Sequence, residues 1–186
     1  MFHHFHGEIH PQTQGSITAK QLDAIIKWLK KNYNLIGAEE FSFKAKNRKV
    51  NKGDLCLTFD DALLCQFDIA LPVISKYNLD VFFFVYSSPL VGEPDPLEIY
   101  RYFRTVFYDD INAFYSEFFL SLESEYSSLI EKGRNLFLEI DYLSAHSYYS
   151  DSDRWFRYIR DNILTKEQYN EAMKKLMDEV KFDHRG

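Results

Sequence analysis

The chain has 186 residues, of which 46% are apolar, 17% aromatic and 27% charged, a globular composition that excludes a disordered chain. Its net charge is −6 and no basic stripe is present, which argues against a nucleic-acid partner. The longest uncharged apolar run, residues 81–92, is too short to span a bilayer, and the N-terminus lacks the pattern of a secretory signal. We therefore expect a cytoplasmic protein with no transmembrane segment.

The N-terminal part begins with one clear helix. Thr18 and Gln21 have the spacing of a capping box, which predicts an amphipathic helix running to about Lys31. A short segment at residues 39–43 follows, and the basic, hydrophilic residues 44–52 predict an exposed loop.

A strand–helix–strand unit comes next. Residues 55–59 predict a strand, residues 63–77 a helix, and the continuous apolar run 79–88 a second strand. Apolar runs without alternation are typical of parallel strands covered on both faces. Pro72 predicts a kink or a new start within the helix. The expected buried face of that helix consists of Leu64, Phe67, Leu71 and Ile74.

The rest of the chain predicts a block of helices. Residues 135–144 fit either a helix or a strand, and Gly133 is placed to end the helix before them. The expected helix starts are Asp95, Asp110, Ser152 or Asp153, and Thr165. Their aromatic stripes are most simply the core between helices.

Two adjacent carboxylates, Asp60 and Asp61, stand where the first strand of the unit ends. Aspartate is common in turns and at helix N-caps, so a solvated turn is the simplest interpretation. In parallel α/β folds, however, sites gather at the carboxyl ends of strands. There one acid could bind a divalent metal ion while its neighbour faces a water on that metal, which keeps both carboxylates ionised and activates the water against a carbonyl.

The stretch from Leu57 to Gly92 (LTFDDALLCQFDIALPVISKYNLDVFFFVYSSPLVG) resembles the opening of the polysaccharide deacetylase family, the NodB-homology domain or carbohydrate esterase family 4. The family's first motif, T-F-D-D, stands here as residues 58–61, and Pro72 matches a proline found in many members. The start of the chain, MFHHF, is similar to the family's lead-in strand, and this similarity places His3 or His4 at the pocket, with surface histidines as the alternative.

The resemblance implies an α/β fold, the N-terminal part of a distorted (β/α) barrel of NodB-homology type. Residues 1–92 would be the N-terminal half of that domain and residues 93–186 a large helical insertion. The implied activity is metal-dependent hydrolysis of the carbon–nitrogen bond of an N-acetylated sugar or polysaccharide precursor. Asp60 would be the general base and Asp61 a metal ligand, with Zn²⁺ as the implied metal.

The chain also departs from the family's pattern. Ala62 replaces the usual glycine, and no histidine pair has the H-[S/T]-x-x-H spacing of the other two metal ligands. His146 copies only the first half of that motif, and His184 is expected to be exposed. A catalytic zinc usually has three protein ligands, and two or three strands cannot close a barrel. We therefore expect a truncated enzyme that is inactive alone.

Two other functions fit the sequence. A non-catalytic helical interaction module would retain a degenerate deacetylase half and use the aromatic-rich block for self-association or for a partner. An enzyme that binds magnesium would need only the oxygen ligands of Asp60 and Asp61 and no histidines.

Overall fold

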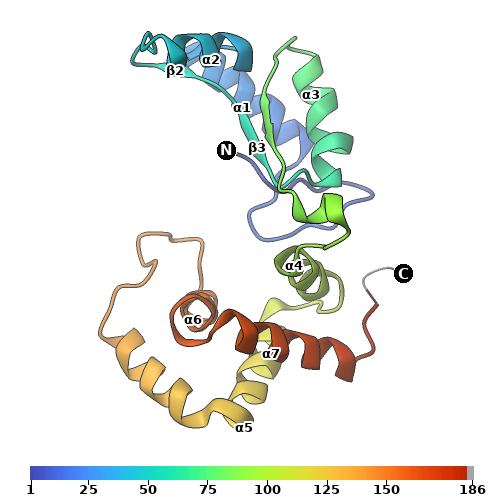
Figure 1. Cartoon of the computed structure of the whole chain (residues 1–186), viewed down its shortest axis with the longest axis vertical. Coiled ribbons are helices and arrows are strands. Elements are labelled where there is room, and N and C mark those ends of the chain that lie inside the picture. The colour runs from blue at the N-terminus through green and yellow to red at the C-terminus, as the bar shows by residue number, and fades with distance from the viewer. Residues whose placement is uncertain (184–186) are drawn as a thin grey trace. The chain divides into compact units, whose positions relative to one another are not determined.

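A computed structural model describes residues 1–183, which form two compact units divided between Pro94 and Asp95. Unit 1 contains short strands and helices, whereas unit 2 is helical (Figure 1). The fold is therefore mixed α/β. The described residues form only two sheets of two strands each and no closed barrel, so the NodB-type barrel remains a prediction.

The first helix of unit 1 follows its capping signals. Helix α1 spans Ala19–Asn32, and the Thr18 side chain accepts a hydrogen bond from the Gln21 main chain while the Gln21 side chain accepts one from the Thr18 main chain. Strand β1 (Asn34–Leu35) then pairs in parallel with β2 (Asp54–Leu55). The predicted capping box is confirmed.

The predicted exposed loop at 44–52 is wrong in its first residues. Helix α2 spans Ala38–Lys46, so Lys44 is helical, and its ammonium group lies 3.2 Å from the buried carboxylate of Asp54. Hydrogen bonds from the main chain of Asn51 and from Asn34 Nδ2, together with Lys44, lower the pKa of Asp54 to about 2. This acid ties the loop to the sheet.

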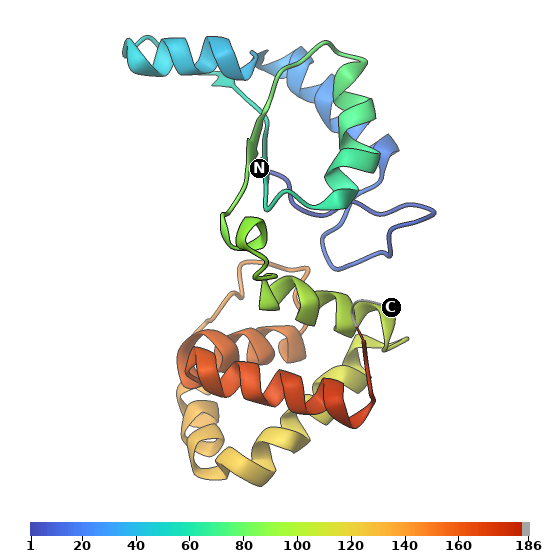
Figure 2. The same ribbon diagram turned by 45° about the vertical axis from the view of Figure 1, so that its right-hand side comes forward.

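The strand predicted at 55–59 is interrupted. Residues 56 and 57 separate β2 from β3 (Thr58–Asp60), and β3 pairs in parallel with β4 (Phe82–Phe84) (Figure 2). On its other edge β3 forms a parallel bridge with Phe2, whose main-chain N–H donates to the Thr58 carbonyl. Strand β3 therefore lies between the N-terminal segment and β4.

The crossover from β3 to β4 contains a change of helix type. A π-helical turn, η1 (Gln66–Ala70), precedes α3 (Leu71–Ser75), so the new helix begins one residue before Pro72, where a kink or a new start was expected. The π turn changes which residues face inward, because one turn holds an extra residue. Leu64 and Phe67, predicted to be buried, are 67% and 65% exposed. The residues that enter the core instead include Cys65, Gln66, Ala70 and Val73.

Strand β4 is not covered on both faces within unit 1. Phe83 and Phe84 are 41% and 54% exposed, although Phe83 also stacks on the fully buried ring of Phe59, with 5.0 Å between the ring centroids. The core of unit 1 lies on the α1 and α3 side, where Leu22, Ile26 and Ile74 contact the sheet residues. The 3₁₀ turn η2 (Ser88–Val91) then ends the unit's strand region.

The helices of unit 2 begin at or near the residues that were expected to start them. The Asp95, Asp110 and Thr165 side chains each cap a helix, and Ser150, two residues before the expected position, caps another. The elements are α4 (Pro96–Val106), α5 (Ile111–Leu138), α6 (Asp151–Tyr158), the π turn η3 (Ile159–Ile163) and α7 (Lys166–Glu179).

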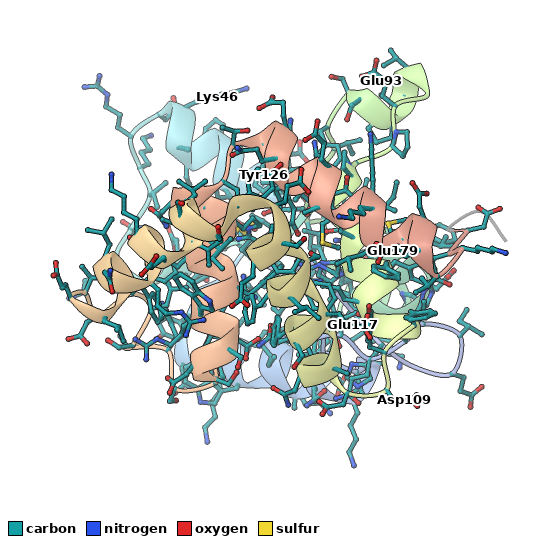
Figure 3. All side chains as sticks on the ribbon, turned by 90° about the horizontal axis from the view of Figure 1, so that it is seen from below. Lys46, Glu93, Asp109, Glu117, Tyr126 and Glu179 are labelled. Carbon is teal, nitrogen blue, oxygen red and sulfur yellow. The ribbon has the colours of Figure 1, made fainter. Side chains whose placement is uncertain are left out.

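Helix α5 continues past Gly133, which was expected to end it. Gly133 is buried, and a Cβ atom there would lie 2.7 Å from Ile163 Cδ1, so this glycine permits a close contact with η3. The helix is kinked instead at Tyr126, whose φ is −125° (Figure 3). Of the segment 135–144, which was left open between helix and strand, residues 135–138 belong to this helix and residues 139–144 are neither helix nor strand.

No helix within residues 1–183 combines the length and the apolar character that a membrane span requires.

Candidate functional site

Three chain segments lie side by side at the carboxyl edge of the β3–β4 sheet: the N-terminal segment, the end of β3 and the end of β4. Phe2 is bridged to Phe59, and the next residue along its segment is His3. Strand β3 ends in Asp60, whose main-chain N–H donates to the Phe2 carbonyl at 3.0 Å. Asp61 donates its own main-chain N–H to the Phe84 carbonyl at 3.0 Å. The parallel pairing therefore places the acid pair and one histidine at the same edge, where parallel sheets commonly carry their sites.

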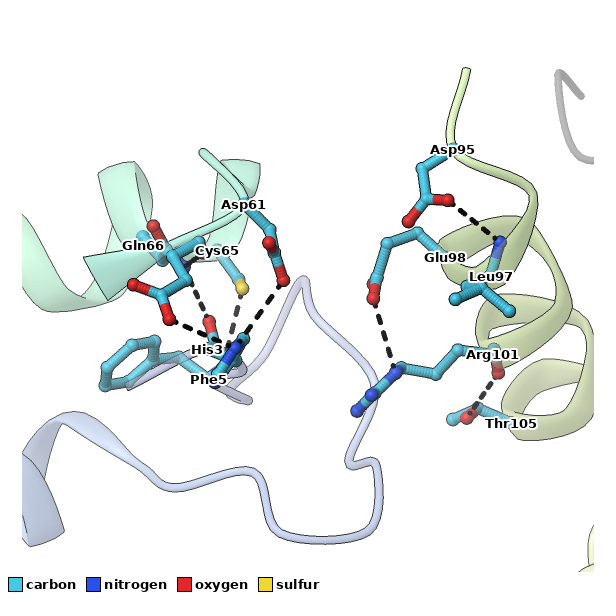
Figure 4. Close-up of polar contacts among 11 residues, drawn as sticks. His3, Phe5, Asp61, Cys65, Gln66, Asp95, Leu97, Glu98, Arg101 and Thr105 are labelled. Carbon is cyan, nitrogen blue, oxygen red and sulfur yellow. Dashed lines mark hydrogen bonds and ion pairs between the residues drawn. The ribbon is translucent and has the colours of Figure 1, made fainter. Parts of the chain in front are cut away.

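His3 lies against both carboxylates. Its Nε2 atom is 3.4 Å from Asp60 Oδ2 and 3.7 Å from Asp61 Oδ2 (Figure 4 draws the second contact). These side chains are between 21% and 38% exposed, so water reaches the cluster. A positive charge on His3 would offset the mutual repulsion of the two acids. His3, one of the two N-terminal histidines that the resemblance placed at the pocket, therefore lies beside the acid pair.

The backbone turns sharply directly after the strand. Asp61 has φ = +77° and Ala62 has φ = +51°, so two consecutive residues with a Cβ occupy the left-handed region. Aspartate tolerates this region, but alanine is strained there because its Cβ approaches the carbonyl oxygen. Strained residues cluster at functional sites, where surrounding contacts hold them in place.

The Ala62→Gly variant is expected to be more stable than the wild type by about 0.5–1 kcal/mol. Glycine removes the steric strain of the folded turn, and this gain exceeds the loss that comes from the higher conformational entropy of glycine in the unfolded chain. The control is Ala45→Gly at an exposed position of α2, which should destabilise the chain by about 1 kcal/mol. Urea-denaturation midpoints measure both. A loss of stability in the Ala62→Gly variant would contradict the strained turn.

An open hollow of about 380 Å³ adjoins the acid pair. Its lining combines both aspartates with apolar and aromatic residues, a composition that suits a ligand with polar and apolar groups. Its lining residues are Met1, Thr58, Asp60, Asp61, Phe84, Val85 and Tyr86.

The donor set does not complete a zinc site. Asp61, Asp60 and His3 are suitable ligand types, but within residues 1–183 no three His, Cys, Asp or Glu side chains are arranged to hold a metal ion. Catalytic zinc usually has three protein ligands. The role of Asp61 as a zinc ligand therefore remains a prediction, and no step proposed below depends on it.

The other histidines make contacts of their own. His10 Nε2 lies 2.8 Å from Asp68 Oδ2, and His6 Nδ1 lies 2.8 Å from Ser16 Oγ. His146, in unit 2, is exposed in a turn region and contacts Tyr148. The expectation for His184 falls outside the described residues.

Gln66 is the residue of the site that the sequence did not reveal. Its side-chain amide donates to the main-chain carbonyls of both His3 and Asp60. A polar residue in an apolar helical segment was the only available signal, and the π turn that points it inward cannot be read from the spacing.

Searches for similarity among protein families, among curated proteins and among solved structures find no match for this chain. The resemblance to the polysaccharide deacetylases therefore stays a prediction from the T-F-D-D motif and its surroundings.

Proposed function

We propose that the chain is a deacetylase-like hydrolase that cleaves the amide bond of an N-acetylated sugar or sugar-polymer precursor. The observation that supports this most strongly is the convergence of His3, Asp60 and Asp61 at the carboxyl edge of parallel strands. The T-F-D-D motif and the hollow beside it add to this support.

The chain's own residues would perform the acid–base part of amide hydrolysis. Asp60, as the general base, accepts a proton from a water whose oxygen bonds to the acyl carbon. The carbon–nitrogen bond then breaks, and the departing amine takes a proton from the imidazolium of His3. Proton return from Asp60 Oδ2 to His3 Nε2, which are 3.4 Å apart, restores the starting state. Such contacts are often longer in ligand-free enzymes and shorten when substrate binds.

Asp61 and the hollow would serve binding and charge balance. Asp61 Oδ2 lies 3.7 Å from His3 Nε2, so its charge acts on the His3 ring beside the reacting groups. Phe84 and Tyr86 offer aromatic surface next to the acids, on which an apolar sugar face and the acyl methyl group would pack.

The test is acetate release from a trimer of N-acetylglucosamine by the full chain, followed by NMR, with no added metal, with Zn²⁺ and with Mg²⁺. We expect slow release above the buffer rate, in place of the inactivity expected from the sequence, because His3 adds a proton donor beside the acid pair. Faster release with Zn²⁺ than with Mg²⁺ would favour the deacetylase over an enzyme built on oxygen ligands alone. No acetate and no free amine under all three conditions would overturn the proposal.

A further inference from the structure

Gln66 joins the two chain segments that carry the acid–base pair. It is 1% exposed, and its Nε2 atom lies 2.8 Å from the His3 carbonyl oxygen and 2.5 Å from the Asp60 carbonyl oxygen. An amide NH₂ group has two hydrogens, so both donors are used by these two contacts. Figure 4 shows the Gln66 side chain between the π turn and the N-terminal segment.

The two carbonyls belong to His3 and Asp60, the residues whose side chains form the proposed acid–base pair. His3 stands between Phe2, which is hydrogen-bonded to β3, and His4, whose carbonyl accepts from Ile17. Among the described residues, Gln66 is the donor that ties the His3 main chain itself to the end of β3. The His3 ring and the Asp60 carboxylate therefore sit on backbone positions fixed by one shared side chain.

Packing of the core alone does not explain a glutamine at position 66. The Gln66 Oε1 atom is buried and has no hydrogen-bond partner among the described residues, which is a cost that an apolar side chain would avoid. Methionine has nearly the same length and would fill the same space without that cost. The hydrogen bonds from its amide to the His3 and Asp60 carbonyls explain why a glutamine stands there.

We propose that Gln66 is a positioning residue that sets the separation between the His3 imidazole and the two carboxylates. Its catalytic consequence rests on the proposed deacetylase function, whereas its effect on His3 does not. The amide acts only through the main chains of His3 and Asp60 and touches no reacting atom.

The experiment compares Gln66→Met with Val73→Ala, a variant of a residue that is 3% exposed in the same core and whose side chain has no hydrogen-bond donor for either carbonyl. The first readout is the change in the His3 ring NMR signals when Asp61 is replaced by asparagine. We expect this change to fall by about half or more in the Gln66→Met background and to persist in Val73→Ala, because the charge interaction weakens with distance.

The second readout is acetate release. Gln66→Met should lower kcat by about tenfold or more with KM changed by less than about twofold, since a small misplacement of acid and base affects the chemical step. Val73→Ala should leave both parameters near the wild-type values at a temperature where it is folded.

An unchanged His3 response in Gln66→Met, or equal responses in the two variants, would overturn the positioning role whatever the activity. If the wild type releases no acetate, the proposed function fails alone, because the His3 signals still decide the role of Gln66.

Discussion

Replacing Asp60 by asparagine is expected to lower acetate release by about 10²-fold or more, down to the uncatalysed rate. The amide side chain keeps the shape of the carboxylate but accepts no proton from water. The main-chain hydrogen bonds of residue 60, to Phe2 and from Gln66, are unaffected by this change, so the fold of unit 1 should persist. Rates and far-ultraviolet circular dichroism measure the two effects.

The matched control is Asp68→Asn. Asp68 also pairs with a histidine, His10, at 2.8 Å, but it stands on η1 and does not line the hollow. Its variant should retain the rate within about twofold, as surface substitutions away from a site usually do. Full activity in Asp60→Asn, or equal losses in both variants, would remove Asp60 from the role of general base.

The second large effect is expected in unit 2, where Phe156→Ala should destabilise the unit by about 3–5 kcal/mol. Phe156 is 1% exposed, and its ring centroid lies 5.1 Å from that of Phe118 and 5.5 Å from that of Phe114. The guanidinium of Arg104 also lies over this ring, 4.9 Å from its centroid, and its Nε atom is buried without a hydrogen-bond partner among the described residues. Truncation leaves a cavity and removes a cation–π partner.

The chain's two tryptophans make this measurement specific to one unit. Trp28 lies in unit 1 and the buried Trp155 in unit 2, so fluorescence in a Trp28→Phe background follows unit 2 during denaturation. Phe107→Ala is the control, because Phe107 is 44% exposed and should cost about 1 kcal/mol or less. Equal small effects of the two variants would mean that Phe156 is not at the centre of the core.

The helices with strong boundary signals were predictable from sequence. Thr18, Asp95, Asp110 and Thr165 each cap a helix because a short polar side chain can reach free main-chain N–H groups one turn ahead. These contacts are local, so the sequence carries all the information that they need.

Contacts between distant segments were not predictable in the same way. The spacing of apolar residues assumed an α-helix after Asp61, and the π turn at Gln66 invalidated the inward face assigned to Leu64 and Phe67. Gly133 was interpreted as a helix end, whereas it permits the approach of Ile163, thirty residues away in the chain. Periodicity cannot reveal a residue chosen for a tertiary contact.

The site itself was predicted in part. The position of Asp60 and Asp61 at a strand end followed from the apolar run before them, and the structure places them there. The approach of His3 depends on the parallel bridge between Phe2 and β3, which joins residues far apart in sequence. The roles of base and metal ligand remain predictions from the resemblance.

The most direct measurement of whether the acid pair is a substrate site or a solvated turn is an NMR titration of the full ¹⁵N-labelled chain with the N-acetylglucosamine trimer. The proposed function predicts shifts of the main-chain signals of Phe2, Asp61 and Tyr86, at the carboxyl edge and the hollow, and weaker shifts with the trimer that lacks acetyl groups. Unchanged signals at these residues, or shifts confined to unit 2, would contradict the account and favour a turn without a site.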